Sequence, residues 1–94
     1  MILLSPDAVE DVERLRTFLD QSSPDAARRA LASIWTAIER LQEFPGMGMP
    51  TGDGDIRQIV VRFGGSGYIV RYAPLPADGN ILITRIWHGR EGRT

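Results

Sequence analysis

The stretch from residue 57 to residue 90 constrains the fold of this 94-residue chain more than any other. It contains three runs of β-branched and aromatic residues, at 59–63, 68–72 and 81–87, with turn-forming residues between them. A parallel return needs a crossover of about a dozen residues or more, so strands this close in sequence pair antiparallel. The stretch therefore predicts a three-stranded antiparallel meander.

The two faces of this meander differ in composition. A four-residue turn at 64–67 would set Val61 opposite Val70, and a loop centred on Asp78 would set Val70 opposite Ile86. This register predicts a core face made of Ile59, Val61, Phe63, Tyr68, Val70, Tyr72, Leu82, Thr84 and Ile86. The other face is mixed and consists of Val60, Arg62, Ile69, Arg71, Ile83, Arg85 and Trp87.

The first half of the chain carries the signals of two helices. Ser-Pro-Asp-Ala occurs at 5–8 and again at 23–26, and serine is a favourable N-cap while proline suits the first helical position. Apolar residues then recur with the helical period, namely Ala8, Val12, Leu15 and Leu19, followed by Ala27, Ala30, Leu31, Ile34, Ile38 and Leu41. We expect helices from 6 to about 20 and from 24 to about 43, joined as an antiparallel hairpin.

Together these segments predict one α/β (α+β) domain spanning residues 1–94. A short apolar run at 2–4 is expected as an edge or added strand, and the Gly- and Pro-rich segment 44–55 as a loop. The helix hairpin should pack on a mainly antiparallel sheet. We expect Trp35 in the core, and Met47 and Met49 as lids over it.

Composition excludes several kinds of chemistry. The chain has no cysteine and one histidine, so we expect no metal cluster, no thiol chemistry and no cofactor. No run of about 18 apolar residues occurs, so we expect no membrane span and a cytoplasmic location by default. Ser66 lies in a glycine-rich turn, which favours a flexible reversal over a nucleophile.

Charge is unevenly distributed along the chain. Residues 1–55 contain ten acidic residues and five arginines, a balance of −5, whereas residues 56–94 contain two acidic residues and six arginines, a balance of +4. Arginine suits bidentate contacts to carboxylates and phosphates. We therefore expect a partner-binding surface on the meander, with the candidate residues Arg62, Arg71, Arg85, Trp87, His88 and Arg90.

Two alternatives to this binding surface remain open. The arginines can simply cover a solvated face with their aliphatic stems. His88 can be a strand-end residue without chemistry, since no acid partner for acid–base catalysis can be named. Arg71 and Arg85 would lie opposite each other and repel, and the helix acids look badly placed to relieve this. An anionic partner is expected to supply the missing charge.

Several segments resemble a known family. The opening Leu-Leu-Ser-Pro-Asp-Ala at 3–8 looks like an apolar strand followed by a capped acidic helix, and 37–48 is similar to the pattern AI-x-x-L-x-x-h-P-x-x-G. Tyr-Ile-Val-Arg-Tyr at 68–72 and Ile-Trp-His-Gly-Arg at 86–90 resemble paired closing strands. Over nearly the whole chain these segments resemble the RelE/ParE superfamily of bacterial toxins from type II toxin–antitoxin pairs.

The resemblance implies partners and two alternative mechanisms. A cognate antitoxin with an acidic, amphipathic C-terminal segment is expected, and a toxin dimer within a larger toxin–antitoxin complex is left open. RelE-like members cut mRNA on the ribosome with basic sheet residues and a C-terminal tyrosine. Arg62 and Arg90 fall where such members place basic residues, but Ile69 replaces an arginine and no tyrosine follows Arg90.

The ParE branch is the better match. The long second helix, the Phe44-Pro45 break and the Trp-His-Gly-Arg ending resemble that branch, whose studied members poison DNA gyrase by binding and show no hydrolytic site. The preferred prediction is therefore a ParE-like toxin that inhibits DNA gyrase by direct binding and is not an enzyme. The alternative is a RelE-like, ribosome-dependent mRNA interferase, an endoribonuclease with an altered basic catalytic set.

Overall fold

The computed structural model describes residues 1–21 and 23–91. The elements in chain order are β1 (Ile2–Leu4), α1 (Pro6–Asp20), α2 (Pro24–Arg40), β2 (Met49–Pro50), β3 (Arg57–Phe63), β4 (Ser66–Leu75), β5 (Asn80–His88) and a 3₁₀ turn, η1 (Gly89–Glu91). The strands form one five-stranded sheet in the order β1-β5-β4-β3-β2. β1 runs parallel to β5, and the other pairs are antiparallel. The predicted fold class and meander are confirmed.

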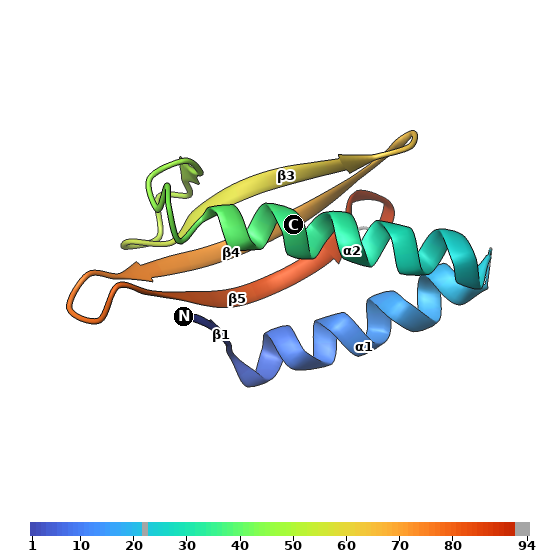
Figure 1. Ribbon diagram of the computed structural model, residues 1–94, viewed down its shortest axis with the longest axis horizontal. Helices are drawn as coiled ribbons and strands as arrows, with labels where there is room; N and C mark the ends of the chain where they lie inside the picture. The colour runs from blue at the N-terminus through green and yellow to red at the C-terminus, as the bar shows by residue number, and fades with distance from the viewer. Residues whose placement is uncertain (22, 92–94) are drawn as a thin grey trace.

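Both helices cover one face of the sheet (Figure 1). The repeated Ser-Pro-Asp-Ala signals begin them as expected, since Ser5 Oγ accepts the Ala8 N–H at 3.1 Å and Ser23 Oγ accepts the Ala26 N–H at 3.3 Å. Ser5 Oγ also donates to the carbonyl of Thr84 at 3.0 Å, which ties the start of α1 to β5. The second helix ends at Arg40, slightly before the predicted end near residue 43.

The core lies between the helices and the sheet. It is formed by Ala8, Leu15, Ala30, Ile34, Ile38 and Leu41 from the hairpin and its end, and by Val61, Tyr68, Val70, Tyr72, Ile81, Ile83 and Ile86 from the strands. Trp35 packs half-buried against this core, as predicted. Met47 and Met49 are 43% and 75% exposed, so the prediction that they cover the core is wrong. Met49 instead begins β2, a strand that the sequence did not indicate.

The strand register differs from the prediction in two places. The β3–β4 turn has only two residues, Gly64 and Gly65, so Val61 pairs with Tyr68 and not with Val70. Gly64 has a φ of 60°, which suits glycine in such a tight turn. A shift of two residues preserves the faces of both strands, because side chains alternate with a period of two. The predicted faces of β3 and β4 are therefore correct although the register is not.

A β-bulge changes the faces of β5. Val70 pairs with Ile86 and Arg71 with Arg85 as predicted, but the register shifts between Arg71 and Tyr72, so that Tyr72 pairs with Ile83. The extra residue on β5 reverses the orientation of everything before it. Ile83 is therefore fully buried in the core, whereas Leu82 and Thr84, which were predicted there, are only half-buried. Within residues 1–21 and 23–91, no helix is long and apolar enough to cross a membrane.

Candidate partner-binding surface

A row of apolar side chains crosses the face of the sheet that the helices leave uncovered. Val60, Ile69 and Trp87 lie directly opposite one another on β3, β4 and β5. They alternate with buried core residues along their strands, and so they point away from the helices. Val60 is 52% exposed and Trp87 only 6%, so the row is open at the β3 end. With Arg62 and Arg71 beside it, we call this five-residue set the outer-face surface.

Arg71 is held in place on this surface. Its Nε donates to the Gln58 side-chain oxygen at 3.0 Å, and its guanidinium carbon lies 5.0 Å from the centre of the Trp87 ring. A cation over a tryptophan ring is stabilised by about 0.5–1 kcal/mol at exposed sites. A guanidinium fixed before binding loses less conformational entropy when a partner arrives. Arg62, by contrast, is exposed at the end of β3.

Arg85 is turned away from the outer-face surface and towards α1. Its Nε donates to Asp11 Oδ2 at 2.8 Å and its Nη2 to Oδ1 at 3.2 Å. Asp11 is only 2% exposed, so this is an ion pair whose acidic end is buried. The expectation that the helix acids are badly placed is wrong. Because α1 runs beside β5, Asp11 reaches the guanidinium of Arg85, the residue paired in register with Arg71, and offsets its charge.

Asp11 also binds the open edge of β5. β1 ends at Leu4, and beyond it the backbone N–H of Ile86 donates to Asp11 Oδ2 at 2.8 Å. Arg14 donates to Asp11 Oδ1 at 2.6 Å and to the carbonyl of Ile86 at 3.1 Å. Burial alone would raise the pKa of Asp11, but hydrogen bonds from the two guanidiniums and the backbone N–H lower it below its ordinary value.

The position of Asp11 in the sequence already indicated that its side chain is buried, although the search for apolar residues passed over it. Asp11 lies three residues after Ala8 and four before Leu15, which are both fully buried, so it occupies the buried stripe of α1. A single acid in that stripe requires a buried cation or donors. The hydrogen bond to Asp11 correspondingly raises the pKa of Arg85.

His88 lies inside the molecule and not on the outer-face surface. It is 4% exposed, and its ring centre lies 5.1 Å from that of Phe18 on α1 and 5.0 Å from that of Tyr68 on β4. Its Nδ1 accepts the backbone N–H of Arg90 at 2.9 Å. Arg90 itself is exposed on η1.

The six residues predicted for the partner surface therefore fall into three groups. Arg62, Arg71 and Trp87 share the outer face of the sheet. Arg85 and His88 lie towards α1, through their contacts with Asp11 and Phe18. Arg90 lies on η1. Because Arg85 and His88 face α1, the six predicted residues do not form one continuous surface.

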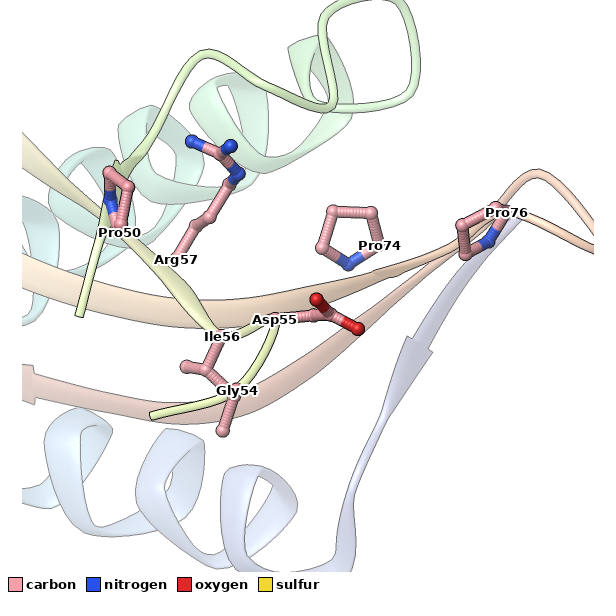
Figure 2. Close-up of a pocket in the computed structure, with 7 residues that line it drawn as sticks. All are labelled: Pro50, Gly54, Asp55, Ile56, Arg57, Pro74 and Pro76. Atoms are coloured by element: carbon pink, nitrogen blue, oxygen red, sulfur yellow. The ribbon is translucent and has the colours of Figure 1, made fainter. Parts of the chain in front are cut away.

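A pocket of about 420 Å³ lies at the opposite end of the sheet, and none of the six residues lines it (Figure 2). Its lining consists of Pro50, Gly54, Asp55, Ile56, Arg57, Pro74 and Pro76. Arg57 is engaged with the preceding loop, since its Nη1 donates to the carbonyl of Gly48 at 2.7 Å. Among the described residues, no group of three or more histidine or acidic side chains is arranged to hold a metal ion.

Comparison with known proteins adds to these observations. Residues 2–92 match the family described as the ParE toxin of the type II toxin–antitoxin system, parDE. Toxin RelE1 of Caulobacter vibrioides is 37% identical over 92 residues, which cover 98% of this chain and 96% of that toxin. Toxin RelE3 of the same organism is 33% identical over 90 residues, covering 96% of this chain and 95% of that toxin.

Two solved structures share the fold. The chromosomal ParDE system from P. aeruginosa superposes with a TM-score of 0.73 at 18% identity, over 93% of this chain and 92% of that one. The intact E. coli RelBE toxin–antitoxin complex gives a TM-score of 0.65 at 14% identity, over 97% of this chain and 98% of that one.

Proposed function

The chain belongs to the ParE toxin family of type II toxin–antitoxin systems, within the RelE/ParE superfamily, and we propose that it acts by binding DNA gyrase and is neutralised by a cognate antitoxin. The observation that carries the proposal is the outer-face surface, an apolar row open at Val60 and flanked by the guanidiniums of Arg62 and Arg71. Apolar contact area combined with arginine is typical of protein-binding surfaces.

The placement of the groups suited to proton transfer favours binding over hydrolysis. His88 is 4% exposed and lies between aromatic rings. The sequence contains two tyrosines, and Tyr68 and Tyr72 are 2% and 0% exposed within the core. A general base must come within hydrogen-bond reach of the proton that it removes. The charged residues of the outer-face surface are instead Arg62 and Arg71, whose guanidiniums remain protonated and suit the binding of anions.

The antitoxin is the second partner in this proposal. The sheet half of the chain carries a balance of +4, with two acidic residues and six arginines in residues 56–94. An acidic, amphipathic segment that is disordered alone can fold on such a surface, burying its apolar side chains while its carboxylates meet guanidiniums. A toxin dimer within a larger toxin–antitoxin complex stays a proposal. Measuring the mass of the complex in solution tests it.

Two assays run in parallel test the proposed target. We expect the purified chain to inhibit DNA supercoiling by purified gyrase, and Val60→Glu to abolish this inhibition without changing the melting temperature. Val60 is suited to this purpose because it is 52% exposed and lies outside the core. Primer extension on translated mRNA should show no cleavage that depends on the chain.

The opposite result would favour the second mechanism. The relatives from Caulobacter carry RelE names, so the ribosome-dependent mRNA interferase is the alternative that this pair of assays distinguishes. Cleavage of translated mRNA combined with unimpaired supercoiling would contradict gyrase binding.

A further inference from the structure

The imidazole of His88 hydrogen-bonds forward along the chain to the backbone of Arg90. Its Nδ1 accepts the Arg90 N–H at 2.9 Å. A side-chain acceptor that binds the N–H two residues ahead closes the same kind of ring as an Asx turn. Because Nδ1 is the acceptor, the ring proton of the neutral imidazole is on Nε2. The hydrogen bond therefore specifies both the tautomer of His88 and the direction in which the chain leaves β5.

Aromatic rings from two other elements fix the orientation of this imidazole. The Tyr68 ring on β4 lies edge-on to His88, with centroids 5.0 Å apart and an interplanar angle of 86°. The Phe18 ring on α1 lies 5.1 Å away and is tilted by 51°. With only 4% of His88 exposed, the ring has little freedom to turn. Its Nδ1 is thus a pre-oriented acceptor for the turn that follows.

The turn that His88 holds lies against β4 at the end of the outer face. A β-carbon on Gly89 would come within 3.2 Å of the Gly67 carbonyl oxygen and 3.7 Å of the Ile69 side chain. Gly67 pairs in register with Arg62 on the next strand. Since Gly67 has no side chain, nothing larger than hydrogen stands at that position between Arg62 and η1. The backbone therefore brings Arg90 to the same end of the sheet as Arg62.

We propose that His88 is a positioning residue, which holds the Arg90 N–H through its buried Nδ1 and so keeps the Arg90 backbone at the Arg62 end of the sheet, where the two side chains bind an anionic group of the partner. The inference rests on the proposed function, because it assigns a contact to the same binding surface. Both arginines are exposed, whereas His88 is 4% exposed and acts through the backbone of Arg90. Its contribution is to reduce the entropy lost when Arg90 becomes ordered on binding.

Three substitutions of His88 distinguish the effect of its hydrogen-bond acceptor from the effects of its aromatic ring and its size. In His88→Asn, an amide oxygen takes the place of Nδ1 and can still accept the Arg90 N–H. His88→Gln carries its amide one methylene further and leaves that N–H without its acceptor, and His88→Phe keeps an aromatic ring but no acceptor. Hydrogen exchange at the Arg90 amide measures the bond directly. We expect protection in the wild type and in His88→Asn, and loss of protection in His88→Gln and His88→Phe.

A double-mutant cycle shows whether His88 acts through Arg90. Loss of one hydrogen bond corresponds to a few-fold to about tenfold weaker inhibition of gyrase in His88→Phe, and Asn should recover most of it relative to Phe. Arg90→Ala should weaken inhibition at least as much, and adding His88→Phe to Arg90→Ala should cause no further loss. Additive effects, or His88→Asn behaving like His88→Phe in amide exchange, would overturn the proposal.

The two proposals fail in different ways. A wild-type chain that leaves gyrase unaffected contradicts the proposed target, whereas the exchange of the Arg90 amide still decides whether His88 holds the turn. In that event, growth arrest on induction of each variant replaces supercoiling in the same cycle. Unchanged Arg90 protection in His88→Phe and His88→Gln would refute the positioning role whichever target is found.

Discussion

At the scale of single residues, one hydroxyl explains why the loop after α2 has a Pro-x-x-Gly pattern. The Tyr72 hydroxyl donates to the carbonyl of Pro45 at 2.8 Å and accepts the N–H of Gly48 at 2.8 Å. Arg57 Nη1 donates to the Gly48 carbonyl at 2.7 Å. Gly48 is buried beneath these contacts, and a β-carbon there would lie 2.6 Å from the Tyr72 hydroxyl oxygen and 2.9 Å from the carbonyl oxygen of Gln58. Only glycine lets the loop approach the sheet this closely.

The two glycines of this loop provide a matched test. We expect Gly48→Ala to lower the free energy of unfolding by about 1–3 kcal/mol, because the methyl group must displace a backbone oxygen and the buried hydroxyl. Gly46→Ala is the control, since a β-carbon at Gly46 would meet nothing within 4 Å. For a domain of this size the melting temperature should fall by roughly 4–8 °C per kcal/mol in the first variant and stay nearly constant in the second. Equal melting temperatures would show that the loop adapts at no cost.

At the scale of elements, α1 completes the edge of the sheet that β1 leaves unfinished. β1 pairs with residues 81–83 of β5 and then turns into α1 through Ser5, whose N–H donates to the carbonyl of Ile83 at 2.9 Å. Beyond that point, side chains of α1 take the place of a neighbouring strand and hydrogen-bond the backbone of β5. Asp11 accepts the N–H of Ile86, and Arg14 donates to its carbonyl. A strand edge covered in this way offers no free template for pairing with another chain.

This arrangement makes Asp11 the acid whose removal should be most costly. Asp11→Asn retains an acceptor for the Ile86 N–H but loses the charge that two guanidiniums bind. Because both of those side chains are about a third exposed, at 35% and 36%, solvent screens them, and we expect a loss of about 1–2 kcal/mol at neutral pH. The control is Asp25→Asn, whose ion pair with Arg28 is exposed and should contribute less than about 0.5 kcal/mol.

The contribution of Asp11 should depend on pH. Its pKa is lowered in the folded chain, so its stabilising effect is complete above the unfolded value of about 3.9 and is lost as the pH falls through the folded value. The difference in melting temperature between the wild type and Asp11→Asn should therefore shrink as the pH falls below about 4. A difference that stays constant throughout the acid range would mean that Asp11 acts through shape and not charge.

At the scale of the whole molecule, local sequence patterns predicted where the helices and strands lie. How these elements pack and pair depends on contacts between residues far apart in the chain. The caps at Ser5 and Ser23 placed the start of each helix correctly, because an N-cap depends on residues three positions away. The faces of the first half of β5 were predicted incorrectly, because a bulge opposite Tyr72 is not encoded by local alternation.

The candidate site was predictable to a smaller extent. The sequence indicated that Arg62, Arg71 and Trp87 share a face, since they alternate with apolar core residues. It did not indicate that Arg85 binds Asp11, because these residues are 74 positions apart and meet only once α1 lies beside β5. The burial of His88 likewise depends on Phe18 from the far end of α1.

The charge asymmetry of the molecule leads to a prediction about antitoxin recognition. Residues 1–55 carry −5 and residues 56–94 carry +4, so a segment rich in carboxylates should prefer the sheet over the helices. Arg62 is the arginine with which to test this, because it is exposed on the outer face, whereas Arg85 is bound to Asp11 and Arg71 to Gln58. We expect Arg62→Glu to weaken binding of the antitoxin's acidic C-terminal peptide by roughly tenfold, since an attraction becomes a repulsion.

Arg16→Glu is the matched control, because it makes the same change of charge at an exposed position on α1. Titration of each folded variant with the peptide, at low salt and then near 1 M salt, separates electrostatics from packing, since the screening length falls from about 10 Å at 0.1 M to about 3 Å at 1 M. The difference between Arg62→Glu and the wild type should nearly vanish at high salt, while binding through Val60 and Ile69 persists. If Arg16→Glu weakens binding as much as Arg62→Glu does, the antitoxin docks along the helix hairpin and the outer face is left to another partner.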